Sequence, residues 1–211
     1  MLKIEQIELG PVQTNCYLVS NADKVCLIFD PGEEAPKIKG LLKKRGFTPL
    51  AILLTHAHFD HIGAVDDLRD DYGIPAYLHY LEREWLGRPN LNGSGKYAAL
   101  PDYRIKEADR LITDEKKLDI GSFTMDLLHT PGHSPGSITF SFKEEGFAIV
   151  GDTLFRGSIG RTDLIDGSEV KLLQSIRQSI LSLPGGTVLF PGHGPDTTPE
   201  EERETNPFLR M

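Results

Sequence analysis

Three histidines and an aspartate directly follow a buried-strand pattern, and this segment constrains the fold more than any other. The continuous apolar run at 50–55 is typical of a strand that is buried on both faces. The run ends at a cluster of His56, His58, Asp60 and His61. Burying four such groups without a partner is costly, so the segment predicts a metal site at the tip of a strand.

Three further polar residues follow apolar runs in the same way, namely His133, Asp152 and His193. Ligands at the ends of neighbouring strands converge in space. A set of histidines and carboxylates without cysteine favours zinc, with iron or manganese as alternatives. Seven ligands are too many for one tetrahedral ion and predict two metals about 3.5–4 Å apart. His79 and His129 are interpreted as structural.

The two halves of the chain repeat a similar order of elements. In the first half we expect strands and helices, with strands at 2–9, 15–20, 24–30, 50–55 and 74–78 and helices at 33–45, 61–73 and 79–87. In the second half we expect one hairpin at 116–130 and another at 137–152. A helix at 168–182 and a last strand at 187–191 should follow. The last helix is expected to bury Val170, Leu173, Ile176 and Ile180. The pattern predicts an α/β chain with two mixed sheets packed together, helices outside and one domain over 1–211.

Residues 87–108 interrupt this rhythm with a segment rich in glycine, asparagine and proline. A loop of this length is either a binding loop or a surface insertion. The two cysteines, Cys16 and Cys26, are predicted to be buried thiols in adjacent strands rather than a disulfide.

Charge and hydropathy exclude several classes of partner. The chain of 211 residues has a net charge of −8, and its longest basic run is Lys43 to Arg45. This argues against nucleic acid or an anionic membrane as the main partner. The amino-terminal segment lacks the apolar core of a signal peptide, and no run is long enough to span a membrane. We therefore expect a cytoplasmic protein.

Several segments resemble the motifs of a known family. THAHFDHIGA at 55–64 resembles the signature of the metallo-β-lactamase superfamily, and TPGHSPGS, GDTLF and FPGHG match its later motifs in order. GPVQTNCYLV and ETNPFLR are similar to segments of the glyoxalase II group, the hydroxyacylglutathione hydrolases. The resemblance implies an αββα four-layer sandwich of two mixed β-sheets, with the site at one edge of the sheets.

The resemblance also assigns roles to the candidate ligands. His56, His58 and His133 would hold the first of two Zn²⁺ ions, and Asp60, His61 and His193 the second. Asp152 would bridge them. Asp30 is either a residue that orients a ligand histidine or a plain turn residue.

The activity implied is binuclear hydrolysis of a small thioester such as S-lactoylglutathione. A metal-bridging hydroxide, held with Asp60 and Asp152, would attack the acyl carbonyl, and a thiolate would leave. Arg161, Tyr97 and Tyr103 are candidate substrate contacts, although Arg161 also fits a plain turn. The chain stops at Met211, where larger glyoxalase II enzymes continue, so we expect weaker discrimination between thiol carriers.

Other functions fit less well or need a different metal. A persulfide dioxygenase with a single iron has a similar ligand set and remains the main alternative. A non-catalytic metal-binding protein is disfavoured by the complete ligand set. A β-lactamase is disfavoured by the absence of an export signal and by the bridging aspartate.

Overall fold

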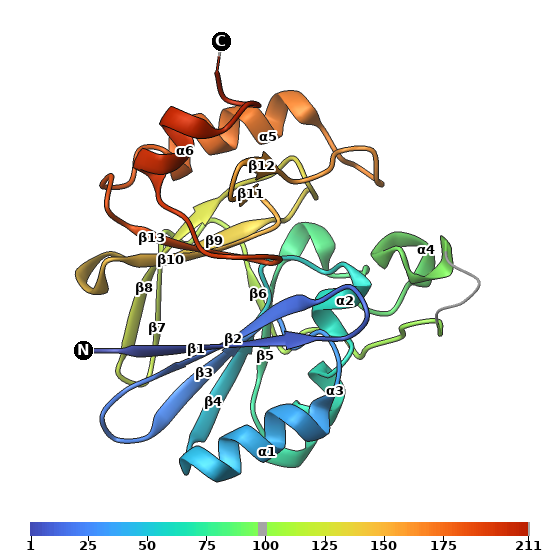
Figure 1. Cartoon of the computed structure of the whole chain (residues 1–211). Coiled ribbons are helices and arrows are strands. Elements are labelled where there is room, and N and C mark those ends of the chain that lie inside the picture. Colours follow the sequence, from blue (N-terminus) through green and yellow to red (C-terminus); the bar gives the residue numbers. More distant parts are fainter. Residues whose placement is uncertain (97–100, 211) are drawn as a thin grey trace. The chain divides into compact units, whose positions relative to one another are not determined.

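The computed structural model describes residues 1–96 and 101–210, and the chain divides into two compact units. Unit 1 comprises Met1–Thr113, and unit 2 comprises Asp114–Met211. Each unit carries one main β-sheet and its own helices (Figure 1). Within the described residues, every helix is too short or too polar to cross a membrane.

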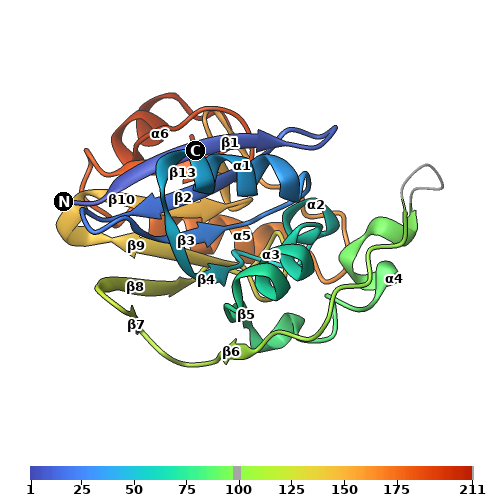
Figure 2. The same ribbon diagram turned by 90° about the horizontal axis from the view of Figure 1, so that it is seen from below.

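Unit 1 is built on a six-stranded mixed sheet with the strand order β1-β2-β3-β4-β5-β6 (Figure 2). Its strands are β1 (Lys3–Leu9), β2 (Thr14–Ser20), β3 (Val25–Phe29), β4 (Thr48–Leu53), β5 (Ala76–His79) and β6 (Arg110–Ile112). The first three strands are antiparallel neighbours, and β3 to β6 run parallel. Cys16 and Cys26 are buried free thiols on the adjacent strands β2 and β3, as predicted.

The helices of unit 1 are shorter than the sequence predicted. They are α1 (Ala35–Arg45), α2 (Phe59–Ile62), α3 (Val65–Tyr72) and α4 (Pro89–Asn92). The helix expected over 61–73 is interrupted at Gly63, and the one expected over 79–87 is only a 3-10 turn at Tyr80–Glu82. Figure 1 shows α1 and α3 next to each other, and their residues are in contact.

Unit 2 is built on a five-stranded sheet with the order β13-β10-β9-β8-β7. The strands are β7 (Lys117–Ile120), β8 (Phe123–His129), β9 (Ile138–Phe142), β10 (Phe147–Gly151) and β13 (Val188–Pro191). Both predicted hairpins are present, and β10 and β13 run parallel. Two short strands, β11 (Leu154–Phe155) and β12 (Ser158–Ile159), form a small hairpin of their own.

The helices of unit 2 are α5 (Glu169–Ser175) and α6 (Pro199–Thr205), and α5 continues as a π-helical segment at Ile176–Ile180. Leu172, Ile176 and Ile180 are buried with Ala148 and Leu189 of the sheet, so this face of α5 forms the core of the unit. The predicted face was partly wrong, because Val170 is 78% exposed and Leu172 takes the buried place.

In both units the fold brings polar loops together at the ends of parallel strands. Asp30 follows β3 and Thr55 lies shortly after β4, and these two strands are paired at Phe29 and Leu53. Asp152 follows β10 and His193 lies shortly after β13, paired at Gly151 and Pro191. The carboxyl ends of neighbouring parallel strands meet at one edge of a sheet, which is the usual place for a site in such folds.

Candidate metal centre

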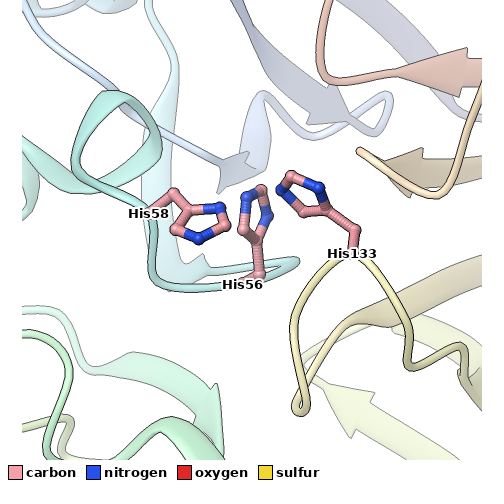
Figure 3. A group of neighbouring side chains, drawn as sticks. All are labelled: His56, His58 and His133. Atoms are coloured by element: carbon pink, nitrogen blue, oxygen red, sulfur yellow. The ribbon is translucent and has the colours of Figure 1, made fainter. Parts of the chain in front are cut away.

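Three buried imidazole rings lie close together where the chain leaves β4 and enters α2. His56 and His61 are fully buried, and His58 is 4% exposed. The ring of His56 lies 4.8 Å from that of His58 and 4.2 Å from that of His61, measured between centroids. Figure 3 shows His56 and His58 on this turn, and it shows His133 on the loop between β8 and β9 of unit 2.

Asp30 determines which nitrogen of two histidines can bind a metal. Its Oδ2 accepts from Thr55 Oγ1 at 2.6 Å and from His61 Nδ1 at 3.0 Å. Since the Thr55 hydroxyl proton is donated to Asp30, Thr55 Oγ1 accepts from His56 Nδ1 at 3.0 Å. Both histidines then carry their proton on Nδ1, so Nε2 is the nitrogen that could bind a metal. Asp30 therefore makes the hydrogen bonds expected of a residue that orients ligand histidines, and this role stays a prediction.

Asp60 is held beside His61 by its own contacts. Its Oδ2 lies 3.4 Å from His61 Nε2 and accepts a hydrogen bond of 3.0 Å from Thr14 Oγ1. Thr14 is the first residue of β2 and belongs to the GPVQTNCYLV motif. The motif alone did not predict its contact with Asp60. Gly32 packs against the backbone of α2 so closely that an added Cβ would lie 1.8 Å from the Asp60 carbonyl oxygen.

Glu82 is a second buried carboxylate beside the histidine turn, and sequence analysis missed it. Its side chain is fully buried, and its Oε2 accepts from the Ala57 backbone N–H at 2.6 Å. Ala57 lies between His56 and His58, so Glu82 holds the backbone between two candidate ligands. The ring of Trp85 lies 5.6 Å from that of His58. Nothing in the sequence around Glu82 indicates that its carboxylate is buried and binds the Ala57 N–H.

In unit 2, Asp152 lies between two histidines. Its Oδ2 is 3.6 Å from His133 Nε2 and 3.6 Å from His193 Nε2. His133 Nδ1 donates to the backbone carbonyl of Arg161 at 2.9 Å, because a carbonyl can only accept. This again leaves Nε2 as the ligand atom.

These separations suit metal ligands better than hydrogen-bonded pairs. Two ligand atoms that each lie roughly 2.0–2.1 Å from a tetrahedral ion are roughly 3.3–3.4 Å apart. The His61–Asp60 distance of 3.4 Å and the two distances of 3.6 Å at Asp152 are close to this value. The donor set of imidazole nitrogens and carboxylate oxygens suits zinc, iron or manganese.

Of the two tyrosines predicted to contact the substrate, only Tyr103 lies within the described residues. Tyr103 is half-buried, packs on Phe59 of α2 with ring centroids 5.8 Å apart, and donates its hydroxyl to Glu33. Burial, followed by the hydrogen bond to Glu33, raises the pKa of the Tyr103 phenol well above its ordinary range. Tyr97 lies outside the described residues.

Arg161 lies on the surface of unit 2 and forms a bidentate pair with Asp163. Its Nε and one terminal nitrogen donate to the two carboxylate oxygens, each at 2.7 Å. The guanidinium group is 54% exposed and has further donors on its other edges. Its backbone carbonyl, rather than its side chain, makes the contact with His133.

The described part of segment 87–108 is ordered by buried polar contacts. Asn92 and Ser94 are buried, and Asn92 Nδ2 donates to the carbonyls of Trp85 and Tyr103 at 3.1 Å and 2.9 Å. Asn92 Oδ1 accepts from Ser94 Oγ at 2.8 Å. These contacts tie Asn92 and Ser94 to Trp85 and Tyr103, and the choice between a binding loop and a surface insertion stays open.

The two histidines interpreted as structural have local backbone partners. His79 is buried, and its Nδ1 accepts from the Leu81 backbone N–H at 3.4 Å. His129 Nε2 donates to the Pro135 carbonyl at 2.9 Å. Each ring thus bonds to the backbone of the segment that follows its own strand, and the structural role of the two histidines stays a prediction.

Comparison with known proteins finds one family over most of the chain. Residues 9–193 match the family model described as the metallo-beta-lactamase superfamily. The relative named "Probable metallo-hydrolase YqgX" from Bacillus subtilis is 49% identical over 99% of this chain and 98% of its own length. Hydroxyacylglutathione hydrolase GloC from Haemophilus influenzae is 34% identical over 99% of this chain and 98% of its own length.

Solved structures share the same fold. The BLEG-1 B3 metallo-beta-lactamase is 53% identical with a TM-score of 0.97, covering 99% of this chain and all of that one. TTHA1623, solved in a di-iron-bound form, is 40% identical with a TM-score of 0.85, covering 97% of this chain and all of that one. The predicted α/β fold with two mixed sheets and flanking helices is confirmed.

Proposed function

The chain belongs to the metallo-β-lactamase superfamily, and from this premise we propose that it is a metal-dependent hydrolase. The observation that carries the proposal is the position of Asp152, whose Oδ2 is equally distant, at 3.6 Å, from His133 Nε2 and His193 Nε2. A carboxylate oxygen between two ligand histidines suits a bridge between two metal ions. The Asp30 network, which presents Nε2 of His56 and His61, supports the same proposal.

We propose a binuclear metal centre with the ligand sets that the family resemblance implies. In this proposal the first ion is bound by His56, His58 and His133. The second ion is bound by Asp60, His61 and His193, and Asp152 contacts both. Zinc is the proposed metal, with iron as the alternative because TTHA1623 was solved with two irons.

We further propose that the substrate is a small thioester. When bound, the two metals supply an acidified water molecule and a positive field for the developing oxyanion. A thiolate leaves without being protonated, since a thiol pKa is only about 8.5. The site residues therefore have to orient the ligands and the acyl group, and a proton donor is not required. The hydroxyacylglutathione hydrolase GloC, 34% identical, supports this substrate class.

Arg161 and Tyr103 are the proposed contacts to the thiol carrier. The Arg161 guanidinium is 54% exposed, and its planar charged group has the geometry that binds a carboxylate, such as one on the carrier. Tyr103 packs on Phe59, next in sequence to Asp60. The net charge of −8 disfavours nucleic acid as the main partner. The two buried free thiols suit the reducing cytoplasm in which we place the protein.

A second candidate activity is β-lactam hydrolysis. The observation that favours it is the 53% identity and TM-score of 0.97 to the structure of the BLEG-1 B3 metallo-beta-lactamase. The same centre can polarise a lactam carbonyl, but the amine that leaves must be protonated before or as it departs. Thioester cleavage does not require a proton donor for its leaving group, and we therefore rank it first.

A side-by-side substrate test decides between these activities. We expect the zinc-loaded protein to hydrolyse S-lactoylglutathione with a kcat/KM at least about tenfold above that for nitrocefin, a difference of about 1.4 kcal/mol in activation free energy. Initial rates are measured by absorbance, with Arg161→Ala beside wild type to test the carrier contact through KM. As controls, the metal-free protein should be inactive and Arg45→Ala, which removes an exposed arginine paired with Glu5, should behave as wild type.

Other outcomes of the same test contradict the proposal. A higher kcat/KM for nitrocefin would make β-lactam hydrolysis the main activity. Oxygen uptake with glutathione persulfide, seen with one iron per chain and without thioester hydrolysis, would make the protein a persulfide dioxygenase.

A further inference from the structure

We propose that Glu202, together with Asn206, is a positioning residue that holds the three proposed ligands of unit 2 in their places. The inference rests on the ligand roles proposed above for His133, Asp152 and His193. It gives a physical role to the carboxyl-terminal segment ETNPFLR, which sequence analysis used only as a sign of resemblance, and to the helix Pro199–Thr205, which sequence analysis did not predict. Figure 1 shows that helix as α6.

Glu202 is a fully buried carboxylate surrounded by hydrogen-bond donors. Its Oε1 accepts from Thr197 Oγ1 at 2.6 Å, and its Oε2 accepts from Asn206 Nδ2 at 2.6 Å. The backbone N–H of Gly157 points at both oxygens, at 3.2 Å and 3.0 Å. Asn206, also fully buried, donates in addition to the Ser158 carbonyl at 3.0 Å. A buried charge is tolerated only with such compensation, so these contacts define the place of Glu202 closely.

Gly157 and Ser158, whose backbone groups bond to Glu202 and Asn206, lie at the tip of the β11–β12 hairpin. The segment that contains this hairpin begins at Asp152 and ends at Arg161, whose carbonyl accepts from His133 Nδ1. Its two ends touch, because an added Cβ at Gly160 would lie 1.9 Å from the Asp152 carbonyl oxygen and 3.2 Å from His133 Cβ. Fixing the tip of the hairpin therefore fixes both Asp152 and the carbonyl that orients His133.

The same carboxylate also reaches the loop that carries His193. Thr197 lies on this loop, where its backbone N–H and C=O bond to Leu189 of β13 at 3.1 Å and 2.8 Å. Phe155, on the hairpin, lies edge-on to the His193 ring with centroids 6.1 Å apart. Glu202 thus joins the Asp152–Arg161 segment to the His193 loop through one pair of oxygens.

Zinc affinity measured by chelator competition tests this role. We expect Glu202→Ala to weaken zinc binding by about 10- to 100-fold, the usual effect of losing a group that orients a ligand. Glu202→Gln should be intermediate, because the amide keeps one acceptor oxygen but turns an NH₂ donor toward Thr197 or Asn206. Glu204→Gln removes the same charge from an exposed position of the same helix and should leave the affinity unchanged.

A stability control separates positioning from general weakening of the fold. Ile180→Ala creates a cavity in the core of unit 2 at a residue that is not part of the hydrogen-bond network around Glu202. At equal loss of melting temperature, Glu202→Ala should lose zinc affinity and Ile180→Ala should keep it within about twofold. Equal loss of affinity in the two variants would reduce Glu202 to a structural residue and overturn the proposal.

A measurement on the metal-free protein tests the positioning role of Glu202 separately from the proposed metal function. In ¹⁵N spectra of histidine side chains, we expect wild type to show His133 protonated on Nδ1, with slow exchange of that proton. Glu202→Ala should speed this exchange, and Ile180→Ala should not. Unchanged exchange in Glu202→Ala would contradict the positioning role, whereas failure of wild type to bind zinc would contradict only the proposed metal function.

Discussion

Replacing Asp152 with asparagine should lower kcat/KM for thioester hydrolysis by about 10³-fold, since losing several kcal/mol of charge stabilisation costs tenfold for each 1.4 kcal/mol. The amide would keep the shape of the side chain but would lose the negative charge that lies 3.6 Å from His133 Nε2 and from His193 Nε2. Two cations would then face each other with less neutralisation. Initial rates and metal content, measured on the same preparation, give the result.

The matched control for this variant is Glu144→Gln. Glu144 is exposed in the turn between β9 and β10, so its loss changes the net charge equally and leaves the Asp152 loop untouched. It should retain wild-type rates. Wild-type turnover and metal content in Asp152→Asn would show that the aspartate is not a bridge.

Replacing Gly32 with alanine should lower the free energy of unfolding by about 3 kcal/mol and remove much of the bound metal. The new Cβ would lie 1.8 Å from the Asp60 carbonyl oxygen and 2.9 Å from its carbonyl carbon. Both are backbone atoms of α2, so a rotamer change cannot relieve the clash. The helix would have to move, and the side chain of Asp60 with it. Urea unfolding and metal analysis measure the two effects.

The control is Gly40→Ala, the same glycine-to-alanine substitution at a position without a close neighbour. Gly40 lies inside α1, and an added Cβ there has nothing within 4 Å. Removing a flexible glycine from a helix should stabilise the protein by about 0.5–1 kcal/mol. If both variants have wild-type stability and metal content, the close approach of Gly32 to α2 is not important for the centre.

Apolar patterning predicted most strands and the places of the candidate ligands correctly. The run at 50–55 predicted β4, and the runs before Asp152 and His193 predicted β10 and β13. These predictions succeeded because a strand buried on both faces leaves a continuous apolar signature that ends where the chain reaches the edge of the sheet. The same reasoning placed the polar residues at that edge.

Predictions failed where tertiary contacts decide the local structure. The helix expected over 61–73 is interrupted at Gly63, where an added Cβ would lie 2.2 Å from the Gly32 carbonyl oxygen. The helix expected over 79–87 gives way to a turn in which Glu82 points inward and binds the Ala57 N–H. Both contacts join residues far apart in sequence, and local propensity does not report them.

Two functional features could not be read from residue type alone. Helix α6 has the sequence PEEERET, which shows no apolar stripe, and its one buried glutamate is indistinguishable from its exposed neighbours. Thr14 resembles any other strand threonine until its hydroxyl is seen to bind Asp60. Buried polar contacts of this kind become visible only when the partner loops are in place.

Counting the metal ions in the native protein tests the central claim most directly. The protein is purified without chelator, loaded with zinc, passed through a desalting column and analysed for metal and protein together with thioester hydrolysis. We predict two ions per chain, with activity that is lost as the ions are removed. Full thioester hydrolysis with one ion per chain, or with none, would contradict the account.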